Sequence, residues 1–178
     1  MAAKVFISYA HKDEPLRNEL QVHLAMLMRE GLIEIWHDRQ LIPGDRLDWS
    51  IDKNLNQADV ILLLISPDFL ASDYCYKIEK ARALERAARG LSRLISVILR
   101  PCRWDKTDLA NYVVTPTDGK PITQWADQDE AYLDVERSIR RAIAELFPDQ
   151  RPLRRHLRIE ARSAKPRRKK RPSERRGV

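Results

Sequence analysis

Residues 60–65 form an uninterrupted apolar run, Val-Ile-Leu-Leu-Leu-Ile, with polar residues before it and Ser66-Pro67 after it. A half-exposed strand alternates apolar and polar residues, whereas a strand that is buried on both faces is apolar throughout. The run therefore predicts the central strand of a parallel sheet that helices cover on both faces.

Shorter apolar runs and segments with apolar residues at helical spacing lie on both sides of this strand. Gly31, Gly90 and Pro148 mark the ends of predicted elements, and His11 or Asp13 is the expected cap of the first helix. The predicted strands cover residues 4–9, 32–36, 59–65, 94–99 and, in a short fifth strand, about 121–125, and the predicted helices cover about 14–29, 47–57, 73–89 and 129–146.

Strands and helices alternate in this order, which predicts parallel strands joined by right-handed crossovers and hence a three-layer α/β sandwich. In such a sheet, ligands bind beyond the carboxyl ends of the strands, where the strand order reverses. For the order 2-1-3-4-5 this point lies between the first and third strands. It brings together residues 9–13 and 66–69, with Glu79 behind the second loop and residues 36–45 beside them.

One end of the chain carries the positive charge. Residues 151–178 contain 13 Lys and Arg against two Glu, a net charge of +11, so the first 150 residues carry −4 of the total of +7. A segment so charged and so poor in apolar residues cannot bury enough surface to fold. We expect one folded domain over residues 1–148 and a basic, disordered tail over 149–178. The tail either binds an anionic partner such as a nucleic acid nonspecifically, or is a solubilising end or linker.

The sequence argues against several classes of protein. Cys75 and Cys102 have neither CxxC spacing nor a matching His cluster, so we expect no metal site and a reduced, cytoplasmic environment. No apolar stretch approaches the roughly 20 residues that a membrane helix needs, so no membrane association is expected. The sequence also has no GxGxxG and no Walker loop, which argues against NAD bound as a reusable hydride carrier.

Three motifs around the predicted crevice match a known family. They are Val-Phe-Ile-Ser-Tyr-Ala-His at residues 5–11, the loop of residues 36–45 with its Trp-His-Asp and Pro-Gly-Asp, and Cys-Tyr-Lys-Ile-Glu at residues 75–79, where the family has Trp-Cys-x-x-Glu. On these motifs, residues 3–147 resemble a Toll/interleukin-1 receptor (TIR) domain of the bacterial type. Cys75 and Tyr76 depart from the family's Trp and Cys, but the acid, Glu79, is kept.

The resemblance implies a flavodoxin-like fold with five parallel strands in the order 2-1-3-4-5. It also implies an enzyme, an NAD glycohydrolase (NAD+ nucleosidase) that cleaves the nicotinamide–ribose bond and releases nicotinamide and ADP-ribose or a cyclic variant. Glu79 is then the catalytic residue, and NAD is the substrate, with no cofactor. Other TIR domains are the implied partners, and their homotypic assembly would activate the enzyme in bacterial defence or signalling. The alternative is a non-catalytic TIR module for protein–protein interaction.

Position alone favours a plainer role for Glu79. A glutamate on a helix with many charged residues is most often solvated, because charged side chains are rarely buried. The resemblance reverses this interpretation, since an acid at this point marks the active site of the family.

Eight further residues are candidates for binding the substrate, and most of them also have a structural interpretation. The two serines at strand ends, Ser8 and Ser66, could hold phosphates or cap turns. His11 could contact a phosphate or the carboxamide of nicotinamide, or simply begin a helix. Asp38 and Asp45 bracket a loop that is either a simple turn or a mobile lid over the ligand. Trp49 could stack on adenine or nicotinamide, or pack in the core. The candidates are Ser8, Tyr9, Ala10, His11, Asp38, Asp45, Trp49 and Ser66.

Overall fold

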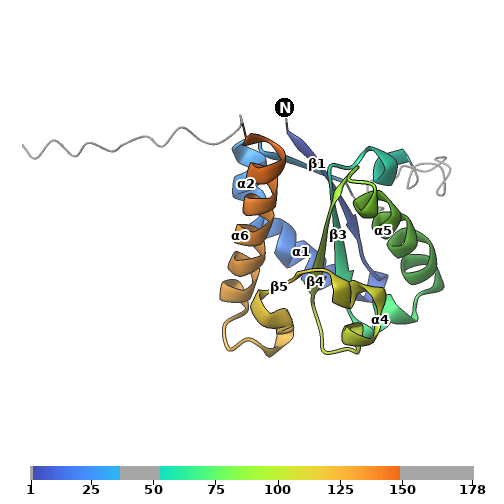
Figure 1. Cartoon of the computed structure of the whole chain (residues 1–178). Helices are drawn as coiled ribbons and strands as arrows, with labels where there is room; N and C mark the ends of the chain where they lie inside the picture. Colours follow the sequence, from blue (N-terminus) through green and yellow to red (C-terminus); the bar gives the residue numbers. More distant parts are fainter. Residues whose placement is uncertain (1, 37–52, 149–178) are drawn as a thin grey trace, which may run out of the picture.

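The computed structural model describes residues 2–36 and 53–148, which form one parallel sheet with helices on both faces (Figure 1). The strands lie in the order β2-β1-β3-β4-β5, and every neighbouring pair is parallel. The predicted flavodoxin-like sandwich and its strand order are therefore confirmed. The strands are β1 (Ala3–Ser8), β2 (Ile33–Trp36), β3 (Val60–Ile65), β4 (Arg93–Ile98) and β5 (Val114–Thr115).

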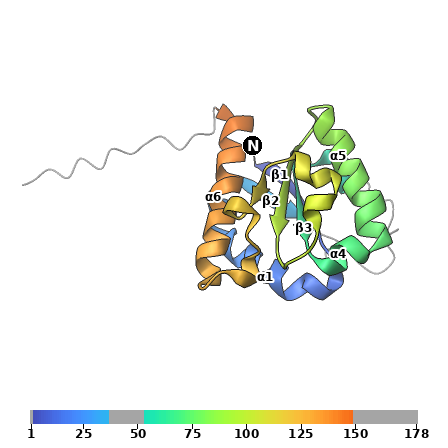
Figure 2. The same cartoon turned by 60° about the horizontal axis from the view of Figure 1, so that its bottom comes forward.

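Two groups of helices cover the sheet, one on each face (Figures 1 and 2). The first group consists of α1 (Glu14–His23), α2 (Ala25–Arg29) and α6 (Gln128–Leu146). The second consists of α4 (Pro67–Ala71), the π-helix η3 (Tyr74–Glu79) and α5 (Lys80–Ala88).

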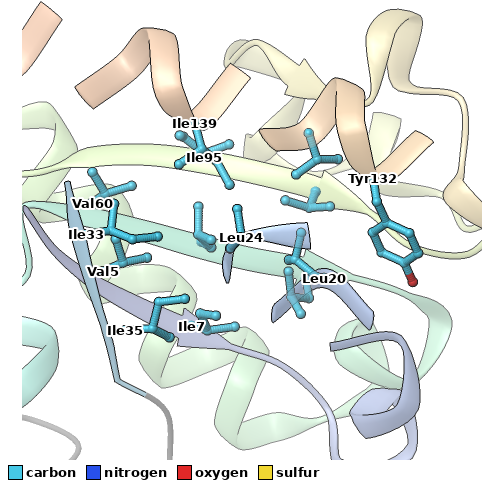
Figure 3. Close-up of a cluster of buried hydrophobic side chains, with 14 of the residues drawn as sticks. Val5, Ile7, Leu20, Leu24, Ile33, Ile35, Val60, Ile95, Tyr132 and Ile139 are labelled. Carbon is cyan, nitrogen blue, oxygen red and sulfur yellow. The ribbon is translucent and has the colours of Figure 1, made fainter. Parts of the chain in front are cut away.

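β3 supplies side chains to both faces, because successive residues of a strand point to opposite sides of the sheet. Its residues are all fully buried; the even-numbered ones join the core cluster under α1 and α6, and the odd-numbered ones join the cluster under α4 and α5. Figure 3 shows the first cluster, in which Leu20 of α1 and Ile139 of α6 pack against Val5, Ile7 and other residues of the sheet. The uninterrupted apolar run thus has the physical origin that the sequence predicts.

The predicted fifth strand is wrong. Residues 121–125 contain the 3₁₀-helix η7 (Ile122–Gln124), in which the Thr123 amide donates to the carbonyl of Leu99, the residue after β4, at 3.1 Å. The fifth strand is instead Val114–Thr115, and it is only two residues long. Pro116 follows it directly and has no N–H with which to continue the ladder.

Two predicted helices are divided in the structure. The first breaks at Leu24, which follows the last residue of α1 and precedes α2, and Met28 of α2 is 40% exposed although it is apolar. The helix predicted over residues 73–89 consists of η3 followed by α5, and the short α4 before it was not predicted. Ser66 caps α4 by accepting from the Phe69 amide at 3.0 Å, with Pro67 at the first helical position.

Gly119 ends the 3₁₀-helix η6 (Thr117–Gly119) with φ +66°, and a Cβ there would lie 2.7 Å from Cζ2 of Trp104. Gly90 has the same backbone conformation, φ +67°, but no atom would lie within 4 Å of a Cβ built there.

Gly90→Ala is expected to lower the free energy of unfolding by about 1 kcal/mol through backbone strain alone. Gly119→Ala should lower the free energy of unfolding by about 1–2 kcal/mol more, because its Cβ would clash with Trp104. Urea unfolding of the two variants measures this difference. Equal losses would contradict the close approach of Trp104.

Some predictions lie outside the described residues. These are the loop residues Asp38, Asp45 and Trp49, the first half of the helix predicted over residues 47–57, and the tail of residues 149–178. Residues 53–57 are helical. The domain boundary at residue 148 and the disorder of the tail stay predictions. Among the described residues, the helices are too short or too polar to cross a bilayer.

Candidate functional site

Ser8 and Glu79 meet at the point where the strand order reverses. Ser8 is the last residue of β1, between the neighbouring strands β2 and β3, and Glu79 is the last residue of η3. The Ser8 hydroxyl donates a hydrogen bond to Oε2 of Glu79. Only 2% of Ser8 and 6% of Glu79 are exposed, so the solvated role that position alone favours for Glu79 is wrong.

The helix that carries Glu79 is anchored at both ends of η3. At its start, the Cys75 thiol donates to the Tyr9 carbonyl at 3.5 Å. Directly after it, Lys80 is 5% exposed, with Nζ 3.9 Å from the centroid of the Tyr76 ring and 3.2 Å from Oδ2 of Asp108. The ion pair ties this segment to the 3₁₀-helix η5 (Asp108–Asn111), and the cation–π contact holds Lys80 against Tyr76 of η3 itself. π-Helical turns are rare and occur frequently at functional sites.

A second serine–carboxylate pair lies at the end of β3. Ser66 is fully buried and donates to Oδ2 of Asp13, which is 1% exposed. Arg100, two residues after β4, donates from Nε to Oδ1 of Asp13 at 2.9 Å and also pairs with Asp68. Lys12 completes the cluster at 3.0 Å from Asp68. The loops that follow β1, β3 and β4 are thus joined through charged side chains.

Asp68 makes the stability of this cluster depend on pH. Its hydrogen bond from Arg100, with Lys12 beside it, holds the pKa of the carboxyl below its ordinary value of 3.8. A lowered folded-state pKa gives stability that is present above the unfolded pKa and is lost as the pH falls through the folded value.

We therefore expect wild-type stability to fall below about pH 4 more steeply than that of Asp68→Asn, as measured by urea unfolding at a series of pH values. Asp118→Asn, a change at an exposed carboxylate, is the matched control and should follow the wild type. Parallel curves for the wild type and Asp68→Asn would refute the coupling to Arg100.

The other sequence-predicted site residues separate into two groups. Ala10 is buried in the cluster that also contains Cys75, on the side of Glu79. The Tyr9 ring lies in the opposite core cluster, where the Arg17 guanidinium is 5.0 Å from its centroid, and His11 is exposed with its ring edge-on to Tyr9. The alternation of β1 continues past Ser8, and it separates the Tyr9 side chain from Glu79.

An aromatic pair flanks the site on the side of β2. Trp36 stacks on Phe6 with a centroid distance of 5.3 Å, and both belong to the cluster on the α5 side of the sheet. Phe6 is two residues before Ser8 and points to the same face of the sheet. This face of the sheet therefore carries an aromatic stack next to β2 as well as the buried Glu79 carboxylate.

Residues 5–134 match the family model for the TIR domain. The chain belongs to the TIR-domain family. The match contains both serine–carboxylate pairs and every residue of the charged cluster, so these parts of the candidate site lie within the residues that match the TIR-domain model.

A curated relative of this TIR domain is the uncharacterized protein y4lF of Sinorhizobium fredii (strain NBRC 101917 / NGR234). The two are 50% identical over 138 residues, which cover 78% of this chain and 43% of that protein. The chain thus spans less than half the length of this relative.

Two solved structures are also similar to this TIR domain. The TIR domain of the Toll-related receptor TRR-2 from Hydra magnipapillata has 21% identity and a TM-score of 0.48, over 83% of this chain and 98% of that one. A prokaryotic SEFIR domain has 18% identity and a TM-score of 0.47, over 78% and 92%. Both TM-scores are below 0.5, so the family assignment rests on the sequence match.

Sequence reasoning missed the charged cluster of this TIR domain. Asp13 was expected as a helix cap, but its side chain makes no cap hydrogen bond and binds Ser66 and Arg100 instead. Asp68 and Arg100 follow the buried strands β3 and β4 within three residues, and this placement at carboxyl ends was the available signal. In residues 2–36 and 53–148, no group of three or more potential metal ligands is found.

A groove of about 830 Å³ lies at the other edge of the sheet. Its walls include β4, residues 111–115 and the end of α6, and it contains none of the candidate residues. β5 pairs only with Ser96 and Val97, so within the described chain residues 93–95 of β4 have no strand beside them on this edge. The groove is thus a second surface feature, separate from the site at Glu79.

Proposed function

We propose that this TIR domain is an NAD glycohydrolase in which Glu79 is the catalytic residue. The observation that supports it is the burial of the Glu79 carboxylate at the point where the strand order reverses, hydrogen-bonded to Ser8. Burying a carboxylate costs free energy, so a buried acid with a specific hydrogen-bond partner is a candidate for a functional group. A solvated helix face would not need such an arrangement.

A single carboxylate is sufficient for this reaction. Glycoside hydrolysis usually needs one acid to protonate the leaving group and a second carboxylate to stabilise or attack the sugar. The nicotinamide of NAD is already cationic and departs neutral, taking the electron pair of the C1′–N bond, so the first acid is unnecessary. A negative group beneath the ribose stabilises the positive charge that develops there, and it does so best where water is excluded. Water then adds to C1′ and loses a proton.

The surroundings of Glu79 fit a flat, partly apolar substrate. The Trp36–Phe6 stack supplies an aromatic wall on the same side of the sheet. The contacts of NAD with the loop residues Asp38, Asp45 and Trp49 stay predictions, as do those with Tyr9, Ala10, His11 and Ser66.

Activity through self-assembly is part of the proposal. We expect homotypic contacts with other TIR domains to switch on the hydrolase, in a role in bacterial defence or signalling. The product is ADP-ribose or its cyclic variant, according to whether water or the adenine ring attacks C1′.

The test is nicotinamide release by the purified 178-residue chain, both dilute and crowded on beads to enforce assembly. We expect release that rises on crowding and is absent in Glu79→Ala. Chromatography of the second product separates linear from cyclic ADP-ribose. Crowded wild-type protein that releases no more nicotinamide than Glu79→Ala would overturn the proposal.

The groove at the β4 edge supports a second candidate function, a non-catalytic interaction module. An edge strand with unpaired backbone groups is a ready site for a further strand or chain. In that case an inactive wild type and Glu79→Ala should self-associate equally well, as measured by light scattering. Nicotinamide release by the wild type would show that interaction is not the whole function of the domain.

A further inference from the structure

The position of Ser8 is fixed by the centre of the sheet. Ser8 ends β1, whose described pairing with β2 reaches Phe6 and whose pairing with β3 includes Ser8 itself, opposite Leu63. A central strand with partners on both sides is among the most rigid parts of such a fold. Its side chain is therefore a fixed reference point for anything it binds.

The hydroxyl of Ser8 is already committed. A serine hydroxyl has one proton to donate, and Ser8 gives it to Oε2 of Glu79. The residue is also only 2% exposed, less than Glu79 at 6%, so of the pair it is Glu79 that keeps more surface for a substrate to contact. These two facts argue against the direct role in substrate binding that the sequence predicts for Ser8.

The hydrogen bond acts on Glu79 instead. Glu79 stands at the junction of η3 and α5, on a segment that reaches the sheet through side chains and not through a strand ladder. A bond from a fixed strand to one carboxylate oxygen restrains the position of that oxygen and so limits the orientations of the carboxylate. Catalytic groups must be held within a fraction of an ångström of the productive geometry, and small displacements are costly in rate.

We propose that Ser8 is the positioning residue of Glu79. This inference rests on the proposed hydrolase function and assigns Ser8 a role in the rate of the chemical step, with no role in holding NAD. Loss of the hydroxyl should therefore lower kcat and leave KM nearly unchanged.

The experiment compares steady-state nicotinamide release by the crowded full chain for the wild type, Ser8→Ala and Ser8→Cys. Cysteine is close to serine in shape but is a weak donor, so it keeps the packing while weakening the hydrogen bond. We expect both variants to lose about ten- to a hundredfold in kcat, with KM within about twofold of the wild type. Melting temperatures identify any variant that fails to fold. If one of the two Ser8 variants does not fold, kcat and KM of the other variant test the positioning role.

The matched control is Ser96→Ala. Ser96 is also a strand serine, 1% exposed, and its hydroxyl has no hydrogen-bond partner within the described ranges. This variant should keep kcat and KM within about twofold of the wild type, because no hydrogen bond is removed.

The outcomes separate the inference from the proposed function. Folded Ser8 variants with lower kcat and unchanged KM support the positioning role. A raised KM with unchanged kcat assigns Ser8 to the substrate and overturns it, as does wild-type behaviour in both constants. A wild type that releases no nicotinamide overturns the proposed function first, and the positioning role with it.

Discussion

Replacing Glu79 with glutamine is expected to reduce nicotinamide release by about a hundred- to a thousandfold, the usual loss when an electrostatic stabiliser of the transition state is removed. Glutamine has nearly the same shape, and its side-chain oxygen can still accept the hydrogen bond from Ser8. The fold should therefore persist, and only the negative charge is lost. Initial rates of crowded protein at saturating NAD measure the effect.

Glu136→Gln is the matched control for this change. Glu136 is 7% exposed, nearly as buried as Glu79, and lies on α6, where Arg140 is 2.8 Å away. Its loss affects stability, but the rate per folded molecule should stay within about twofold of the wild type, since it lies far along the chain in the opposite helical layer. A Glu79→Gln variant that keeps more than about a tenth of the rate would exclude a catalytic charge at this position.

Replacing Arg100 with alanine is expected to lower the free energy of unfolding by about 3 kcal/mol, the lower end of the cost of breaking a buried ion pair. The reason is Asp13, which is 1% exposed and would keep its buried charge without the guanidinium 2.8 Å away. The Arg100 side chain itself is 33% exposed, so water can replace part of the lost interaction. Equilibrium unfolding in urea, followed by circular dichroism, measures the loss.

Arg103→Ala provides the control for Arg100→Ala. Arg103 pairs with Asp105 at 3.1 Å, but the side chains are 74% and 47% exposed. Exposed pairs contribute at most about 1 kcal/mol, so this variant should unfold close to the wild type. If both variants lost the same stability, the cluster around Asp13 would have no special role in joining the loops.

The sheet was predictable because its signal is local. The apolar run of β3 follows from its burial on both faces, and it can be recognised from six residues. The alternation of strands with helices then indicates parallel strands with right-handed crossovers. The convergence of Ser8 and Glu79 followed from topology, since both lie near carboxyl ends of neighbouring strands. β5 escaped prediction because two residues carry no periodicity.

The parts of the site that were missed depend on contacts distant in sequence. A charged residue in a loop is solvated by default, and the position of Arg100 just after β4 indicates the edge of the sheet on which it lies but does not identify Asp13 as its partner. The π-helical turn was also not predictable, because it changes the helical register without changing the apolar pattern. Burial of Glu79 and Lys80 on a charged helix could come only from the assembled structure.

The bonds that build the site span long stretches of chain: Ser8 and Glu79 are 71 residues apart, Asp13 and Ser66 are 53 apart, and Asp13 and Arg100 are 87 apart. Contacts of such separation form only when distant parts of the chain come together, and the entropy cost of closing these long loops must be met first. A nascent chain therefore has no partial version of this site. Any proteolytic cut between residues 14 and 65 divides all three pairs between two fragments, so the intact sheet is itself the condition for assembling the carboxylates.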